Sequence, residues 1–238
     1  MGLIHRAFKR CGVALPFSGV ICPEHIKSIT FDTDWRAQIT VKQTLVFLEN
    51  PGTSDLHDTC AIAPGTPMED FLRRSPDSAE TRRRKRGREH IVVDWVPRSP
   101  VTPYALYDHQ YTWSPSGSHA QPAFWSEFQC EMKTGTFVLE IVAPGAFETA
   151  VVFERPRWPR LTSERTLMKY ALKQMETGDS QATTVDQGRV EWKILAPRIG
   201  TRYICVAFQF NGVALWQDRL KKGSLVGRMR HLIGLAPT

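Results

Sequence analysis

The sequence lacks the signatures of the large nucleotide-binding and hydrolase families. It contains no Gly-x-x-x-x-Gly-Lys loop, no Gly-x-Gly-x-x-Gly turn and no Gly-x-Ser-x-Gly elbow, the motifs that cradle a phosphate or expose a serine nucleophile. No run of residues reaches the roughly 18 consecutive apolar positions that a membrane-spanning helix needs. These absences argue against a transmembrane helix and lower the expectation of an enzyme without excluding one.

Cysteine and histidine are few and scattered. The five cysteines include no Cys-x-x-Cys pair, and the seven histidines include no His-x-x-x-His pair, so the ligand spacings of a zinc site are missing. We therefore predict neither a metal nor a cofactor. An odd number of widely spaced cysteines is typical of reduced thiols, which favours a cytoplasmic location.

Positive charge is concentrated in two segments. The formal net charge is +7, of which residues 73–90 carry +5 and residues 217–238 carry +4, so the rest of the chain has a net charge of −2. Proteins that bind polyanions over a whole face normally spread lysine and arginine across the fold. Any anion would therefore be held by these two segments rather than by the folded body.

Alternation of apolar and polar residues is the dominant pattern. WRAQITVK places Ala37, Ile39 and Val41 on one face of an extended chain, and RVEWKILAP does the same with Val190 and Trp192. Strands with one apolar and one polar face are typical of antiparallel sheets that cover a core. About ten such segments, separated by short turns, predict a mainly β protein with an antiparallel β-sandwich.

Three segments have helical spacing of their apolar residues. The strongest carries Leu167, Met168, Ala171, Leu172 and Met175 on one stripe, which predicts a helix packed on a sheet. The second begins with a capping box, and the third carries an apolar stripe against basic residues. The expected helices span residues 161–177, 66–74 and 219–233.

The domain organisation stays open at this level. A chain of 238 residues suits a single β-rich domain, 1–238, or two subdomains, 1–97 and 104–238, divided near the proline-rich stretch between them. A polar segment separates two expected strands, and we predict that residues 75–90 form a basic loop.

One strand is unusually aromatic. In an extended YALYDHQYTW segment, Tyr107, His109, Tyr111 and Trp113 share a face, and such an amphipathic row suits a ligand groove or an interface hot spot. The alternative is that the row covers the core, with each polar group finding a hydrogen bond. These four residues are the candidate ligand-binding or partner-binding site.

A thiol-based enzyme is a further alternative. His57 lies three residues before Cys60, and a histidine within reach could activate a thiol. Residues three apart in a strand point to opposite faces, however, and no partner motif is present elsewhere. An enzyme would therefore have its site at Cys60 or near His109 and Tyr111.

The arginine-rich segment could bind an anion, act as a localisation signal or simply be solvated. Guanidinium groups bind phosphate through paired hydrogen bonds. The candidate anion-binding residues are Arg82, Arg83, Arg84, Lys85, Arg86 and Arg88. The basic C-terminal helix could likewise contact a membrane surface or a partner, or pack on its own sheet.

These observations favour a non-catalytic, cytoplasmic binding or interaction module that recognises a protein or another ligand through a face of the sandwich. The alternative is a nucleic-acid-associated protein that grips phosphates through residues 82–88 and the basic C-terminal segment. The third hypothesis is the enzyme described above.

Overall fold

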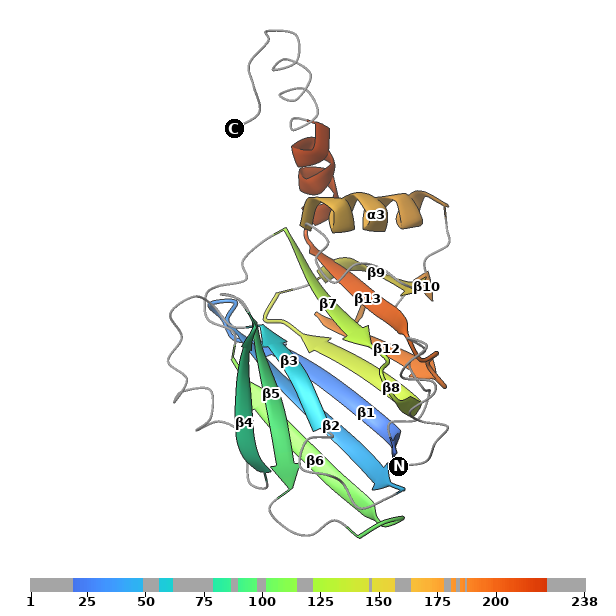
Figure 1. The fold of residues 1–238 in the computed structure, drawn as a ribbon. Coiled ribbons are helices and arrows are strands. Elements are labelled where there is room, and N and C mark those ends of the chain that lie inside the picture. Colours follow the sequence, from blue (N-terminus) through green and yellow to red (C-terminus); the bar gives the residue numbers. More distant parts are fainter. Residues whose placement is uncertain are drawn as a thin grey trace, which may run out of the picture.

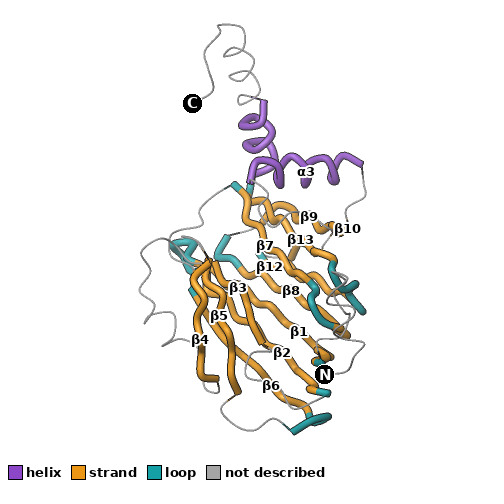
Figure 2. Tube along the Cα trace, in the orientation of Figure 1, coloured by secondary structure: helices purple, strands orange, loops and turns teal. Residues whose placement is uncertain are grey.

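The computed structural model describes residues 19–48, 56–61, 79–86, 90–97, 102–114, 122–145, 147–156, 164–177, 181–182, 185–186 and 188–221. For residues 56–61, 79–86, 90–97, 156, 181–182 and 186 the backbone alone is described. Strands dominate this part of the chain (Figure 2), so the prediction of a mainly β, sandwich-like fold is confirmed.

The largest sheet has six strands in the order β11-β12-β8-β1-β2-β6 (Figure 1). Its members are β1 (Val20–Phe31), β2 (Ala37–Phe47), β6 (Leu106–Trp113), β8 (Lys133–Val142), β11 (Val185–Asp186) and β12 (Arg189–Leu195). β1 and β8 pair in parallel, whereas every other pairing among the described strands is antiparallel. The sequence pattern did not predict this parallel pair. β1 and β8 are far apart in the sequence, so their pairing depends on how the chain between them folds.

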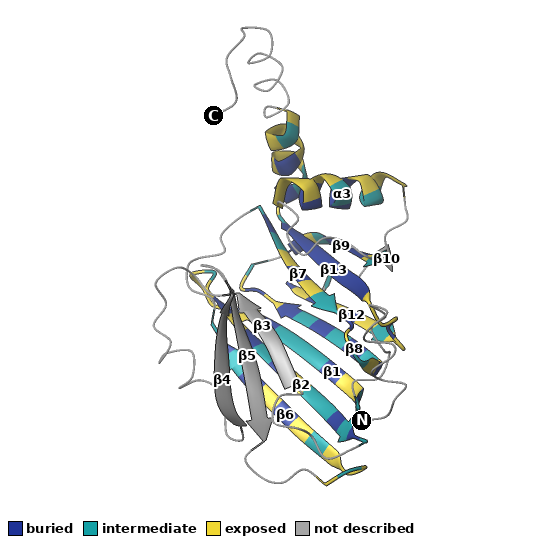
Figure 3. Cartoon of the chain, viewed as in Figure 1, coloured by how far each residue is buried: buried dark blue, intermediate teal, exposed yellow. Residues whose placement is uncertain are grey.

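A second sheet has four strands in the order β10-β9-β13-β7. It consists of β7 (Ala123–Gln129), β9 (Phe147–Pro156), β10 (Gln181–Ala182) and β13 (Thr201–Gln209). The eight residues from Thr201 to Phe208 are all buried, and β13 is dark blue along its length in Figure 3. Such two-sided burial is typical of a strand that is covered on both faces.

A third sheet corrects the predicted basic loop. β3 (Leu56–Ala61), β5 (His90–Pro97) and β4 (Ala79–Arg86) form a three-stranded sheet in the order β3-β5-β4. Most of the arginine-rich segment is therefore strand β4, whose backbone pairs with β5 from Ala79 to Arg86. β4 lies at the edge of this sheet, and edge strands tolerate runs of charge that central strands do not.

Two helices lie in the described residues. α3 (Glu164–Thr177) falls inside the predicted segment 161–177, and its buried residues Leu167, Met168, Ala171 and Leu172 belong to the predicted stripe. A further helix spans residues 212–221. It begins seven residues before the predicted 219–233 helix, whose remaining residues lie outside the described part, as does the predicted helix at 66–74. No helix of the described chain is both long and apolar enough to cross a membrane.

The core has two parts, which together define three layers. One cluster fills the space between the six-stranded and four-stranded sheets and includes Ile29, Val41, Leu139 and Tyr203. The other lies between the opposite face of the four-stranded sheet and the two helices, and includes Met168 and Trp216. The helices and the six-stranded sheet thus enclose the four-stranded sheet (Figure 1), and one face of the six-stranded sheet points away from this core.

Candidate binding face

The exposed face of the six-stranded sheet is a broad, mainly polar surface, which we call the outer face. Because side chains alternate along a strand, the register aligns its residues in rows across five strands. None of them is buried. The outer face comprises Glu24, Ile26, Ser28 and Thr30 of β1; Gln38, Thr40, Lys42, Thr44 and Val46 of β2; Leu106, Asp108, Gln110 and Thr112 of β6; Thr136, Val138, Glu140 and Val142 of β8; and Arg189, Glu191, Lys193 and Leu195 of β12.

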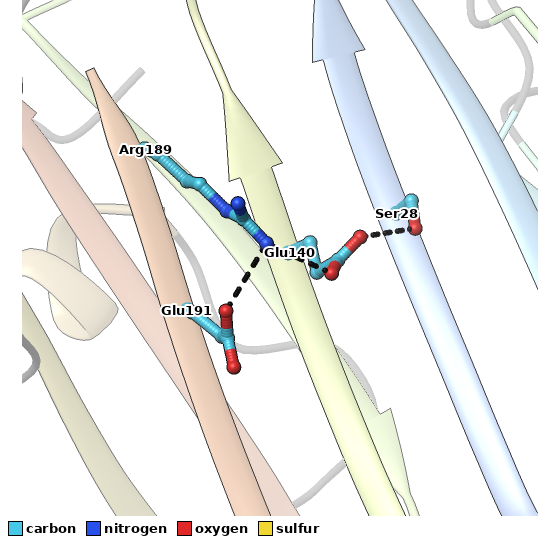
Figure 4. Close-up of polar contacts among 4 residues, drawn as sticks. All are labelled: Ser28, Glu140, Arg189 and Glu191. Atoms are coloured by element: carbon cyan, nitrogen blue, oxygen red, sulfur yellow. Dashed lines mark hydrogen bonds and ion pairs between the residues drawn. The ribbon is translucent and has the colours of Figure 1, made fainter. Parts of the chain in front are cut away.

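An ion-pair network orders one side of this face (Figure 4). Glu140 and Glu191 are direct cross-strand neighbours, an arrangement that is unfavourable for two carboxylates. Arg189 Nη2 donates to Glu140 Oε1 at 3.2 Å and to Glu191 Oε2 at 3.1 Å, and Ser28 Oγ donates to Glu140 Oε2 at 3.0 Å. Since Arg189 is more than half exposed, the network contributes less than about 1 kcal/mol to stability. Its main effect is to fix the positions of the four side chains.

Hydrogen bonds order the other side as well. The hydroxyls of Thr40 and Thr112 lie 3.1 Å apart, and Thr44 Oγ1 donates to Asp108 Oδ1 at 3.1 Å. Cross-strand pairs of this kind stabilise a sheet by tenths of a kilocalorie per mole. The outer face therefore offers hydroxyl and carboxylate groups in fixed positions over neighbouring strands.

The predicted aromatic site lies on the opposite, inner face. His109, Tyr111 and Trp113 are only 2%, 1% and 5% exposed, and Tyr107 is half-buried. The rings follow one another along β6, with the centroids of Tyr111 and Trp113 5.5 Å apart. This burial favours the interpretation of the row as core. Tyr107 Oη and Trp113 Nε1 nevertheless have no hydrogen-bond partner in the structure, although the core interpretation expected one for each polar group.

Two buried histidines form a row that the sequence did not indicate. His25, Gln43 and His109 are cross-strand neighbours on β1, β2 and β6, and Gln43 Nε2 lies 3.3 Å from His25 Nδ1. Burial lowers the pKa of His25 to about 3, with smaller contributions from Lys27 and His109. Burial also lowers the pKa of His109 to about 4. Both imidazoles are therefore neutral at physiological pH.

The sequence offered one clue to this row. His109 belonged to the predicted aromatic strand, whereas His25 was not among the candidate site residues. A bulge between Ile21 and Glu24 determines which residues of β1 face the core. Alternation alone cannot locate such a bulge, which includes Pro23.

The remaining candidates are only partly placed. Arg82 to Arg86 lie in β4 and Cys60 lies in β3, with side chains outside the described part, and Arg88 is outside it entirely. Cys22, Cys130 and Cys205 are free and buried. Burial raises the pKa of the Cys22 and Cys205 thiols to about 12, so they are poor nucleophiles. Among the described residues, no three His, Cys, Asp or Glu side chains are grouped to hold a metal ion.

No family model and no curated protein matches the chain. Similar solved structures include a proposed protease from Parabacteroides distasonis, with a TM-score of 0.42 and 9% identity. They also include native leukotriene A4 hydrolase from Saccharomyces cerevisiae, with a TM-score of 0.36 and 7% identity. Each comparison covers 80% of this chain but only 40% and 29% of those chains. The chain thus spans less than half the length of either protein, and a similarity this distant carries no argument about its activity.

Proposed function

We propose that this protein is a non-catalytic binding module of the cytoplasm that recognises a protein partner through the outer face. The observation that carries the proposal is the fixed array of polar side chains on that face, shown in part in Figure 4. Side chains already held by hydrogen bonds lose less conformational entropy when a partner binds. Such an array is therefore suited to recognition.

The size of the outer face supports a protein partner. It extends over five strands and four rows of side chains. Strands about 4.8 Å apart and a two-residue repeat of about 6.7 Å give an area of roughly 600 Å². A standard interface buries about 800 Å² on each partner, so the outer face could supply most of one.

The charge of the outer face also supports a protein partner over a polyanion. It carries four carboxylates, Glu24, Asp108, Glu140 and Glu191, against three cations, Lys42, Arg189 and Lys193. Proteins that grip phosphate backbones rely on an excess of lysine and arginine. Mixed charge, hydroxyls and a few aliphatic side chains are instead typical of protein interfaces.

The free thiols support the proposed location. Cys22, Cys130 and Cys205 are unpaired with one another, as is usual in a reducing compartment.

The proposal is tested with one substitution at the centre of the outer face. Thr40→Arg replaces a short hydroxyl by a long cation between Ser28 and Thr112. Thr177→Arg makes the same exchange at the exposed end of α3 and serves as the matched control. Each protein is immobilised and exposed to an extract of the source cells, and the retained proteins are quantified by mass spectrometry. We expect a set of proteins retained by the wild type and by Thr177→Arg but depleted at least tenfold by Thr40→Arg. Equal retention by all three would refute the proposal.

Nucleic-acid binding is the second candidate, and one observation favours it. β4 presents Arg82 to Arg86 as consecutive residues of an edge strand. In an extended strand, alternate residues are about 6.7 Å apart along the backbone, so β4 spaces these positions regularly. Such a line could follow a phosphate backbone.

A further inference from the structure

A cavity opens where the edges of the two larger sheets meet. It has a volume of about 510 Å³ and is lined by β9, β12 and α3. The lining is mixed: Phe153, Trp192 and Ile194 are apolar or aromatic, whereas Glu154 and Gln174 are polar. Its volume is in the range of ordinary ligand pockets, about 300 to 1,000 Å³.

The hydrogen bonds of β12 determine which of its backbone groups face outward. Ala143 N donates to Gly188 O, and Ala196 N donates to Gly135 O, at the two ends of the β8–β12 ladder. Because hydrogen-bonded and non-hydrogen-bonded pairs alternate in an antiparallel ladder, Trp192 and Ile194 direct their backbone groups toward β8. Lys193 and Leu195 must then direct their N–H and C=O groups away from β8, along the outer edge.

This outer edge is only partly covered. β11 pairs with β12 at Arg189 and Val190 alone, and no described strand pairs with β12 beyond that point. Lys193 and Leu195 both line the cavity, and Leu195 is 72% exposed. An unpaired edge next to a cavity is the arrangement that accepts an added strand.

We propose that the cavity binds an extended peptide of a protein partner, added as a strand to the outer edge of β12. The peptide backbone pairs with Lys193 and Leu195, and one apolar side chain enters the cavity beside Ile194. This inference rests on the proposed function in that it takes the partner to be a protein, but it assigns a second site, which shares only the edge residues Lys193 and Leu195 with the outer face.

The test uses two substitutions at one position. Lys193→Pro removes the outward N–H and leaves the ladder to β8 intact, since proline is tolerated on an edge whose N–H faces outward. Lys193→Ala removes the side chain but keeps the N–H and is the matched control. The probe is a random heptapeptide library displayed on phage and selected on the wild-type protein. Labelled peptides from the enriched clones are then titrated by fluorescence anisotropy.

We expect enriched peptides that share an apolar residue, bind Lys193→Ala within twofold of the wild type and bind Lys193→Pro at least tenfold more weakly. If Lys193→Pro fails to fold by circular dichroism, Ile194→Trp replaces it, because the larger side chain fills the cavity and should also reduce binding at least tenfold.

Three results would overturn the inference. The first is the absence of any enriched peptide, and the second is equal binding to Lys193→Pro and Lys193→Ala. The third is loss of binding in Ile194→Trp alone. That result would indicate a ligand that uses the cavity without the strand edge. Thr40→Arg keeps this site, so peptide binding should survive in it. Failure of the outer-face proposal and failure of the peptide site are thereby distinguished.

Discussion

Acid should destabilise this protein through His25 and His109. Their pKa values in the folded state are about 3 and about 4, whereas a histidine in an unfolded chain titrates near 6.5. As the pH falls below about 6.5, the unfolded chain binds protons that the folded protein does not, so the stability present at neutral pH is progressively lost. The loss should continue until the pH approaches the folded-state pKa values.

The magnitude follows from the same values. At pH 5, protonation of the unfolded chain favours unfolding by about 2 kcal/mol for each histidine, or about 4 kcal/mol for the pair. A domain of ordinary stability has about 5 to 15 kcal/mol in total. The free energy of unfolding should therefore fall by a large fraction between pH 7.5 and pH 5.

Urea unfolding at a series of pH values measures this loss. The control is the double variant His25→Gln/His109→Gln, which retains amide hydrogen bonding but does not titrate. The other five histidines are common to both proteins, so their contribution cancels in the difference between the two pH profiles. We expect the profile of the wild type to be steeper by about 4 kcal/mol over this range. Parallel profiles would show that the buried histidines are not neutral in the folded protein.

Three further expectations are open to direct measurement. Gly135→Ala should lower the free energy of unfolding by about 1 to 3 kcal/mol, because the added Cβ would lie 2.5 Å from a carbonyl oxygen of β1. Gly145→Ala is the control, since its added Cβ would make an ordinary 3.5 Å contact. Equal stabilities of the two variants would contradict the described packing around Gly135. Cys22 and Cys205, whose thiol pKa values burial raises to about 12, should react with an aromatic disulfide reagent only on unfolding, as mapped by mass spectrometry; rapid labelling of the native protein would be inconsistent with their burial. If residues 82–88 contact six phosphates, the slope of log K against log salt for duplex DNA should be roughly −5. The slope should become flatter when these cations are replaced by alanine. Absence of binding at low salt would eliminate the nucleic-acid candidate.

Alternation predicted the strands that border the core because burial on one face leaves a direct imprint on sequence. Ala37, Ile39 and Val41 of β2, and Val190 and Trp192 of β12, are all buried as their pattern indicates. The stripe of α3 is confirmed for the same reason. The parallel pairing of β1 with β8 left no such imprint, since register between distant strands depends on the rest of the fold.

The sites were harder to predict than the fold. The aromatic row was identified as one face of a strand, but its direction depends on what packs against it, and burial of His109 and Tyr111 places it in the core. The arginine-rich segment was predicted as a loop from its composition, yet most of it forms β4, where pairing with β5 satisfies the backbone and the edge position tolerates a run of charge. The outer face was overlooked because its residues form no sequence motif. Only the register of five strands brings them together.

The most direct test of the central claim is an affinity measurement on the outer face. A protein retained in the extract experiment is purified and titrated by isothermal calorimetry into the wild type, Thr40→Arg and Thr177→Arg, after thermal unfolding has shown that all three are folded. Recognition through the outer face predicts a Kd at least tenfold higher for Thr40→Arg, with Thr177→Arg within twofold of the wild type. Indistinguishable Kd values for the three proteins would contradict it.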